Sequence, residues 1–104
     1  MTETEFNQHV DDTLMRIEAA VEASGADIEY ETASGILTLE FADGSKIIIN
    51  RQGATQELWV AAKAGGFHYR WADGAWRNTR DGSELLAALS GYVSQQAGES
   101  VKLG

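Results

Sequence analysis

Hydrophobic residues near the N-terminus recur at helical spacing. Five of them follow one another in steps of four, four, three and four: Phe6, Val10, Leu14, Ile17 and Val21. Such a stripe is one face of an amphipathic helix. Thr2 and Glu5 have the spacing of a capping box at its start, and Gly25 is suited to end it. The pattern predicts a first helix that packs its apolar stripe on a core.

From Asp27 the hydrophobic period changes from helical spacing to two, which is typical of half-exposed strands. Strands are expected at residues 27–31, 36–41, 46–49, 57–61, 66–71 and 75–78. Two Asp-Gly pairs, at 43–44 and 73–74, favour tight turns between neighbouring strands. Links this short require antiparallel pairing, because a parallel return needs a crossover of about a dozen residues.

A second helical pattern lies near the C-terminus. It opens at Asp81, Gly82 and Ser83, ends at Gly98, and its apolar residues are Leu85, Leu86, Leu89, Tyr92 and Val93. Two amphipathic helices can cover one face of an antiparallel sheet, which must be buried. We therefore predict an α+β fold, a two-layer α/β sandwich in a single domain over residues 1–104. The opposite face of the sheet is then a surface suited to docking.

The composition excludes several kinds of functional site and partner. The 104 residues contain no cysteine, which excludes disulfides and metal or cluster ligation by thiolates. Up to Asp43 there are eleven acids against one base, a net charge of −10, whereas the remainder carries five acids and seven bases, a net charge of +2. The negative electrostatic field around the first 43 residues repels nucleic acid and attracts cations or a basic protein surface. No secretion signal or membrane-spanning run is visible, so we expect neither a membrane partner nor export from the cytoplasm.

Acidic residues of the first third form two rows. On the first helix, Asp11, Glu18 and Glu22 fall within a wedge of about 40° at about 100° per residue. On the first strand, Asp27, Glu29 and Glu31 share one face. Open carboxylate oxygens suit hard cations, exchange them quickly and select poorly among metals. If the first strand lies beside the first helix, the two rows are expected to form one continuous acidic ridge. A solvated polar surface without a ligand remains the alternative.

The outward face of the predicted sheet carries the second candidate site. If Leu58 and Val60 face the core, Trp59 faces out, beside the amides of Asn50 and Gln52 in the link between the third and fourth strands. Exposed tryptophan is common in binding hot spots, although a half-buried tryptophan packed across strands is equally compatible with the pattern.

The two histidines and the other two tryptophans do not form a cluster in the sequence. His9 and His68 have no metal-ligand partner at local spacing and are interpreted as surface residues, while Trp71 and Trp76 are interpreted as core. No phosphate-binding glycine loop, nucleophile elbow or histidine-rich metal motif is present, so no catalytic residue is assigned.

Several motifs together resemble the bacterial frataxins, the CyaY-type family. They comprise residues 46–52 (KIIINRQ), 58–61 (LWVA) and 65–69 (GGFHY), then Trp76, residues 95–98 (QQAG) and the acidic first helix. The similarity covers nearly the whole chain.

The resemblance implies the sandwich fold, weak surface binding of ferrous and ferric iron or other divalent cations, and regulation of iron–sulfur cluster assembly. By position it implies metal binding and desulfurase contact at Asp11, Glu18, Glu22, Asp27, Glu29 and Glu31. It implies partner contact at Asn50, Gln52, Trp59 and His68. The implied partners are cysteine desulfurase and the iron–sulfur scaffold assembly. We expect a monomeric regulator; a passive iron carrier or store that assembles with iron, and an iron-oxidising enzyme, remain alternatives.

Overall fold

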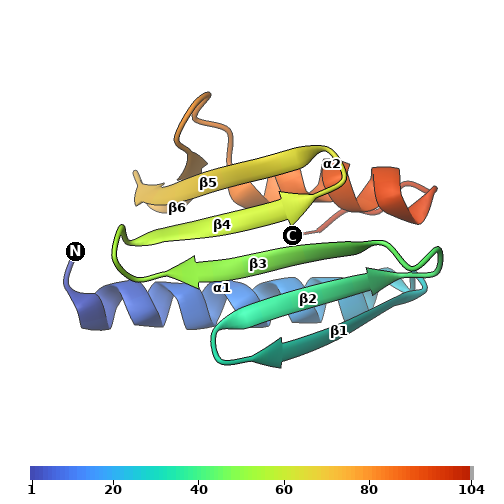
Figure 1. Ribbon diagram of the computed structural model, residues 1–104, viewed down its shortest axis with the longest axis horizontal. Helices are drawn as coiled ribbons and strands as arrows, with labels where there is room; N and C mark the ends of the chain where they lie inside the picture. Colours follow the sequence, from blue (N-terminus) through green and yellow to red (C-terminus); the bar gives the residue numbers. More distant parts are fainter. Residues whose placement is uncertain (104) are drawn as a thin grey trace.

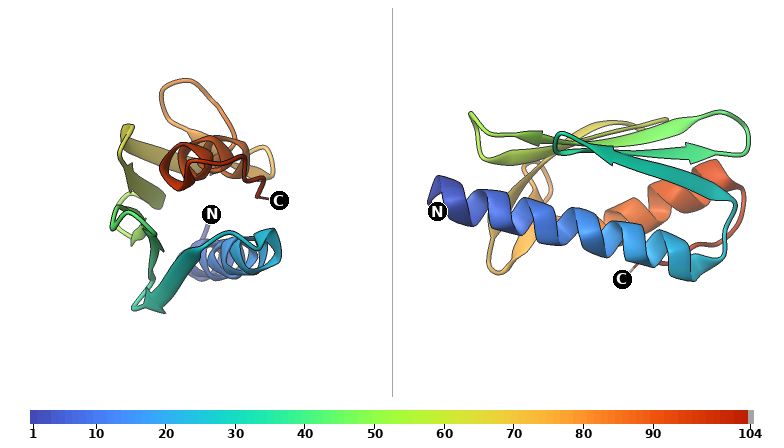
Figure 2. Two further views of the ribbon diagram at one scale, coloured as in Figure 1. Left: turned by 90° about the vertical axis from the view of Figure 1, so that its right-hand side faces the viewer. Right: turned by 90° about the horizontal axis from the view of Figure 1, so that it is seen from below.

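The computed structural model describes residues 1–103 and is a two-layer sandwich. Its elements are α1 (Glu3–Ser24), β1 (Ile28–Ala33), β2 (Ile36–Phe41), β3 (Lys46–Gln52), β4 (Glu57–Ala62), β5 (Gly65–Ala72), β6 (Ala75–Asn78) and α2 (Leu85–Ala97). The six strands form one antiparallel sheet in sequence order (Figure 1). Both helices lie on the same side of the sheet (Figure 2). The predicted fold class is confirmed.

Helix α1 begins and ends at the residues that the sequence indicates. The Thr2 hydroxyl accepts a hydrogen bond from the Glu5 amide at 3.1 Å, and the Glu5 carboxylate accepts one from the Thr2 amide at 2.9 Å. This capping box satisfies two amide groups that have no partner inside the helix. Gly25 ends the helix with φ 69°, a left-handed conformation that costs glycine little.

The core lies between the helices and the inward face of the sheet. The apolar stripe of α1 is buried there, as are alternate residues of the strands: Leu37, Leu39, Ile47, Ile49, Leu58, Val60 and Tyr69. Trp76 of β6 is also buried, and its indole N–H donates to the Thr13 hydroxyl at 2.8 Å. The interpretation of Trp76 as a core residue is confirmed, and its polar atom is satisfied inside the core.

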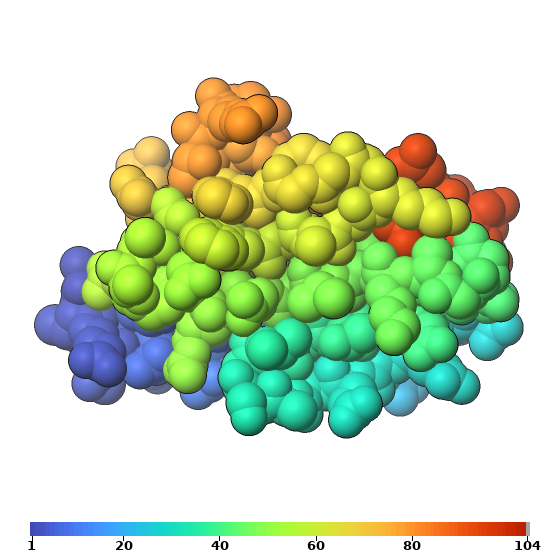
Figure 3. Space-filling model, viewed as in Figure 1, coloured from blue at the N-terminus to red at the C-terminus, as the bar shows by residue number. Residues whose placement is uncertain are grey.

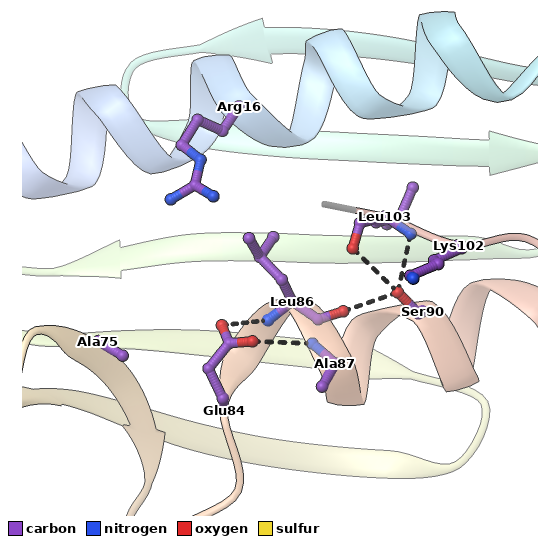
Figure 4. Close-up of a pocket in the computed structure, with 8 residues that line it drawn as sticks. All are labelled: Arg16, Ala75, Glu84, Leu86, Ala87, Ser90, Lys102 and Leu103. Carbon is purple, nitrogen blue, oxygen red and sulfur yellow. Dashed lines mark hydrogen bonds between the residues drawn. The ribbon is translucent and has the colours of Figure 1, made fainter.

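Two predicted boundaries were wrong. Asn50 and Gln52 lie in β3 and pair with β4, rather than in a link between strands, because the ladder continues to Gln52 opposite Glu57. Helix α2 begins after Glu84, not at Asp81 to Ser83, where the Asp81 carboxylate closes a local turn by accepting from the Ser83 amide at 2.9 Å. The Glu84 carboxylate caps α2 by accepting from the Leu86 and Ala87 amides at 2.7 and 3.1 Å (Figure 4).

One side chain in the QQAG segment ties α2 to the sheet. Gln96 is buried, and its amide donates to the Ser45 hydroxyl and the Lys46 carbonyl and accepts from the Lys63 amide. The three bonds measure 3.1, 3.2 and 3.0 Å. Gln96 therefore satisfies backbone groups of two loops and fixes the C-terminal end of α2 over β3.

The segment after α2 returns between the two helices (Figure 2). Its apolar residues Val101 and Leu103 are buried. Their backbone amides donate to the hydroxyls of Ser94 and Ser90, both at 2.9 Å, and Figure 4 shows the bond at Ser90. The sequence patterns did not predict this docked tail, although Val101 and Leu103 have strand-like spacing after Gly98.

Candidate functional site

The acidic row of α1 lies beside the edge strand β1. The Tyr30 hydroxyl donates to the Glu22 carboxylate at 3.1 Å, and the Thr32 hydroxyl donates to the Glu18 carboxylate at 2.5 Å. These bonds attach the side of β1 that faces the helix to the C-terminal half of α1. The Glu22 carboxylate also raises the pKa of Tyr30, because it accepts from the phenol and its negative charge opposes phenolate formation.

The acidic row of β1 points to the other side of the strand. Glu29 lies directly opposite Glu40 of β2, and Glu31 lies opposite Thr38, so both belong to the sheet face turned away from the helices. We call this the outer face. Asp27 is exposed just before β1. Glu18 and Glu22 thus lie on one side of the sheet edge and Glu29 and Glu31 on the other, with the β1 backbone between the rows, so the rows do not form one continuous ridge. Asp27 precedes β1, and Asp11 lies about two helical turns before Glu18 on α1. We call the six predicted carboxylates the acidic edge.

The carboxylates of the acidic edge form no ion pairs among residues 1–103. No lysine, arginine or histidine in this range lies within 4.0 Å of any of the six carboxylates; the ion pairs found there involve Asp43 and Glu57 instead. In the same range, no three carboxylate or histidine side chains lie close enough together to hold one metal ion. The acidic edge is therefore an open surface of oxygen ligands without ion pairs, which suits hydrated cations or a cationic protein better than a buried metal.

Sequence reasoning missed Glu40. It lines a hollow of about 280 Å³ on the outer face with Glu29, Glu31, Thr38 and Lys46. Like charges directly opposite each other on adjacent strands, as Glu29 and Glu40 are, destabilise a sheet. The signal was available, because Leu39 and Phe41 face the core and Glu40 must then face out.

All four predicted partner-contact residues lie on the outer face, which Figure 3 shows in space-filling form. Asn50, Trp59 and His68 are cross-strand partners in one row over β3, β4 and β5, and Gln52 lies in the next row opposite Glu57. Trp59 and His68 stack with ring centroids 4.5 Å apart and planes 8° apart. Trp59 is consequently half-buried although it points outward, so both interpretations from the sequence describe part of its environment.

Glu57 supports that stack and was also missed. Its carboxylate accepts from the Trp59 indole N–H at 2.9 Å and from the Arg70 guanidinium at 2.8 Å, and it lies 3.7 Å from His68 Nδ1. The side chain is only 8% exposed, yet it is fully hydrogen-bonded. The pKa of Glu57 is lowered, mainly because its carboxylate accepts the Trp59 hydrogen bond. Burial of the carboxylate raises the pKa, whereas Thr55 and Arg70 lower it further.

Two exposed isoleucines extend the outer face beside Trp59. Ile36 lies opposite Asn50, Ile48 lies opposite Ala61, and their side chains are 38% and 36% exposed. In the run Ile47-Ile48-Ile49 the middle residue has to face outward, which was the available signal. The outer face therefore has an apolar centre beside the acidic edge.

None of the predicted site residues lines the hollow between the two helices. His9, expected as a surface residue, stacks on Trp71 at 3.9 Å, and Trp71 in turn meets Trp76 edge-on at 5.4 Å. A hollow of about 560 Å³ lies between α1, α2 and the tail, lined by residues that include Arg16, Leu86, Ser90 and Lys102 (Figure 4).

The chain is similar to proteins of one known family. The family model described as Frataxin-like domain matches residues 1–99. The chain belongs to the frataxin family. The "Iron-sulfur cluster assembly protein CyaY" of Dechloromonas aromatica is 53% identical over 99% of both chains, and that of Vibrio cholerae is 50% identical over 97% of both.

Solved frataxin structures share the fold. Frataxin from Psychromonas ingrahamii superposes with a TM-score of 0.92 at 39% identity, covering 98% of this frataxin and 97% of that chain. Trimeric yeast frataxin complexed with ferrous superposes with a TM-score of 0.72 at 25% identity, covering 95% and 88%. Within the described residues of this frataxin, no helix is long and apolar enough to span a bilayer.

Proposed function

We propose that this frataxin regulates iron–sulfur cluster assembly in the cytoplasm by binding iron at the acidic edge and docking on cysteine desulfurase. The observation that carries the proposal is the acidic edge, whose carboxylates form no ion pairs among residues 1–103, beside an outward face with an apolar centre. The names of the CyaY relatives and the ferrous complex of yeast frataxin support the same assignment.

Iron is the cargo in this proposal. Ferric iron is a hard ion that prefers oxygen donors and ferrous iron also accepts them, and Glu18, Glu22, Glu29 and Glu31 offer carboxylates from both sides of β1. Two of them, Glu18 and Glu22, already hold hydrogen bonds from strand hydroxyls, so iron binding there competes with Tyr30 and Thr32. Weak, exchangeable occupancy follows, and it suits a protein that senses or delivers iron.

Docking uses both parts of the surface. The acidic edge attracts a basic surface of the desulfurase and raises the association rate, whereas Ile36, Ile48 and Trp59 supply the apolar contact that slows dissociation. Asn50 and Gln52 add amide donors and acceptors beside Trp59. A scaffold protein bound to the desulfurase is the expected neighbour of this part of the face.

The protein acts as a regulator rather than an enzyme in this proposal. The trimeric yeast relative favours one alternative, an iron store that assembles when loaded. Light scattering during ferrous titration separates the two: the regulator stays monomeric while iron binds, and the store grows in mass. Ferrous oxidation faster than in a carboxylate buffer would instead support an iron-oxidising enzyme.

The direct test is titration of cysteine desulfurase with wild-type protein and with Trp59→Arg. We expect the substitution to weaken binding by about tenfold or more, because it removes a central aromatic contact and places a charge in the apolar part of the docking surface. Thermal unfolding of the variant is measured in parallel, since Trp59 also packs on His68. Absence of wild-type binding at low salt contradicts the proposal.

A further inference from the structure

Besides the acidic edge, the outer face carries another charged region, which is positive and lies on distant strands. Arg70 of β5 lies directly opposite Arg77 of β6, and His68 is two residues from Arg70 on the same face. Two arginines in direct register repel each other unless an anion lies between them. The Arg70 side chain is 61% exposed, whereas the one carboxylate beside it, that of Glu57, is 8% exposed. The surface that a partner meets here is cationic.

The distance between the two regions allows them to act independently. Four strand spacings separate β1 from β5, about 19 Å at about 4.8 Å each. The Debye length at physiological salt is about 8 Å, so the field of the acidic edge is largely screened at Arg70. An acidic ligand can therefore approach Arg70 although the whole protein carries a net charge of −8.

Glu57 holds this region in a defined geometry. It fixes Arg70 through one guanidinium nitrogen at 2.8 Å and fixes Trp59 through the indole N–H at 2.9 Å. A guanidinium has five N–H donors in a rigid fork, and residues 1–103 provide Arg70 with no other side-chain acceptor. The remaining donors face solvent beside the Trp59–His68 stack.

We infer that the part of the outer face formed by β4, β5 and β6 binds an acidic peptide segment of a partner protein. Arg70 binds a carboxylate of that segment, an adjacent apolar side chain packs on Trp59 and His68, and Glu57 is the positioning residue. Carboxylate recognition by arginine, together with a ring stack in which the Trp59 indole N–H is hydrogen-bonded, gives this ligand chemistry. The inference rests on the proposed docking function and adds to it an acidic segment of the partner beside the apolar contact at Trp59.

The test uses a short synthetic peptide that alternates glutamate and leucine, and the same peptide with glutamine in place of glutamate. Backbone and indole resonances of the full-length protein are followed during titration at physiological salt. We expect shifts at Trp59, His68 and Arg70 with the acidic peptide only. Shifts confined to other surfaces, equal shifts with the glutamine peptide, or no binding overturn the inference.

Variants separate a positioned arginine from general charge. Arg70→Gln is expected to weaken peptide binding by about tenfold, because it removes the charge-assisted contact with the peptide carboxylate. Arg16→Gln on α1 makes the same change in net charge and leaves binding unchanged. Glu57→Gln makes the protein less negative, so general electrostatics predicts tighter binding, whereas the positioning role predicts weaker binding. Tighter binding by Glu57→Gln, or equal losses in Arg70→Gln and Arg16→Gln, contradict the inference.

Cysteine desulfurase binding by the same variants keeps the two proposals apart. If Trp59→Arg weakens desulfurase binding while Arg70→Gln changes neither that binding nor peptide binding, the docking function stands and the acidic-segment site fails. If the peptide binds through Arg70 but the desulfurase does not bind, the site stands and the proposed partner is wrong.

Discussion

The acidic edge should cost the protein stability in the absence of a cation. Glu18 and Glu22 are one helical turn apart on α1, and no base within residues 1–103 pairs with either carboxylate. Replacing both by glutamine removes the repulsion. It retains a side-chain oxygen that can accept the hydrogen bonds now donated by Tyr30 and Thr32.

The expected gain follows from the spacing. Like charges at i and i+4 destabilise a helix by about 0.2–0.5 kcal/mol. Relief of that repulsion therefore raises the free energy of unfolding by about 0.4 kcal/mol, which corresponds to about 2 °C in Tm for a domain of this size. Ferrous affinity moves in the opposite direction, falling by about tenfold, because each carboxylate near a divalent ion contributes about 2 kcal/mol before screening.

The assay is chemical and thermal unfolding of Glu18→Gln/Glu22→Gln with and without ferrous iron, alongside iron titration. The matched control, Asp73→Asn/Glu99→Gln, removes two exposed acids elsewhere, so the net charge of −8 becomes −6 in both variants. The control should keep wild-type iron affinity. A loss of stability in the acidic-edge variant with no change in iron affinity would refute the reasoning, because the two carboxylates would then be structural.

Two further predictions concern stability. Leu103→Ala in the buried tail should lower the free energy of unfolding by about 2–4 kcal/mol in urea titration, while Lys102→Ala, exposed between the buried tail residues, changes it little; equal effects would mean that the tail is not docked. The Ser45 hydroxyl and amide, with Lys63, lower the pKa of Asp43 from 3.8 to about 2, so the stability that its carboxylate adds is present above pH 3.8 and lost as pH falls through 2. Asp43→Asn should flatten that acid limb of the stability curve, and an unchanged limb contradicts the assignment.

Local patterns were sufficient for the elements and their order. The stripe from Phe6 to Val21, the capping box at Thr2 and the Asp-Gly turns each depend on residues within a few positions of one another. Strand alternation likewise placed Trp59 on the face opposite Leu58 and Val60. Such features persist because backbone geometry imposes the periods of 3.6 and two wherever the segment packs.

Local patterns were not sufficient where long-range register decides the environment. Glu57 looks like any solvent-exposed acid in an alternating strand, and only its pairing with Arg70 and the stacked Trp59 and His68 buries it. Glu40 became part of the acidic surface only through its place opposite Glu29. The docked tail is held by the hydroxyls of Ser90 and Ser94 on α2, and the sequence does not show that these hydroxyls accept from the tail until the chain has folded back along the helix.

The sequence by itself therefore determined the secondary structure, the sandwich class and the concentration of negative charge in the first third of the chain. Tertiary structure decided that the carboxylates of α1 and β1 lie on opposite sides of the edge strand, because Tyr30 and Thr32, not Glu29 and Glu31, face the helix. Alternation fixes which strand residues share a face, but only packing against the core selects the face that is buried.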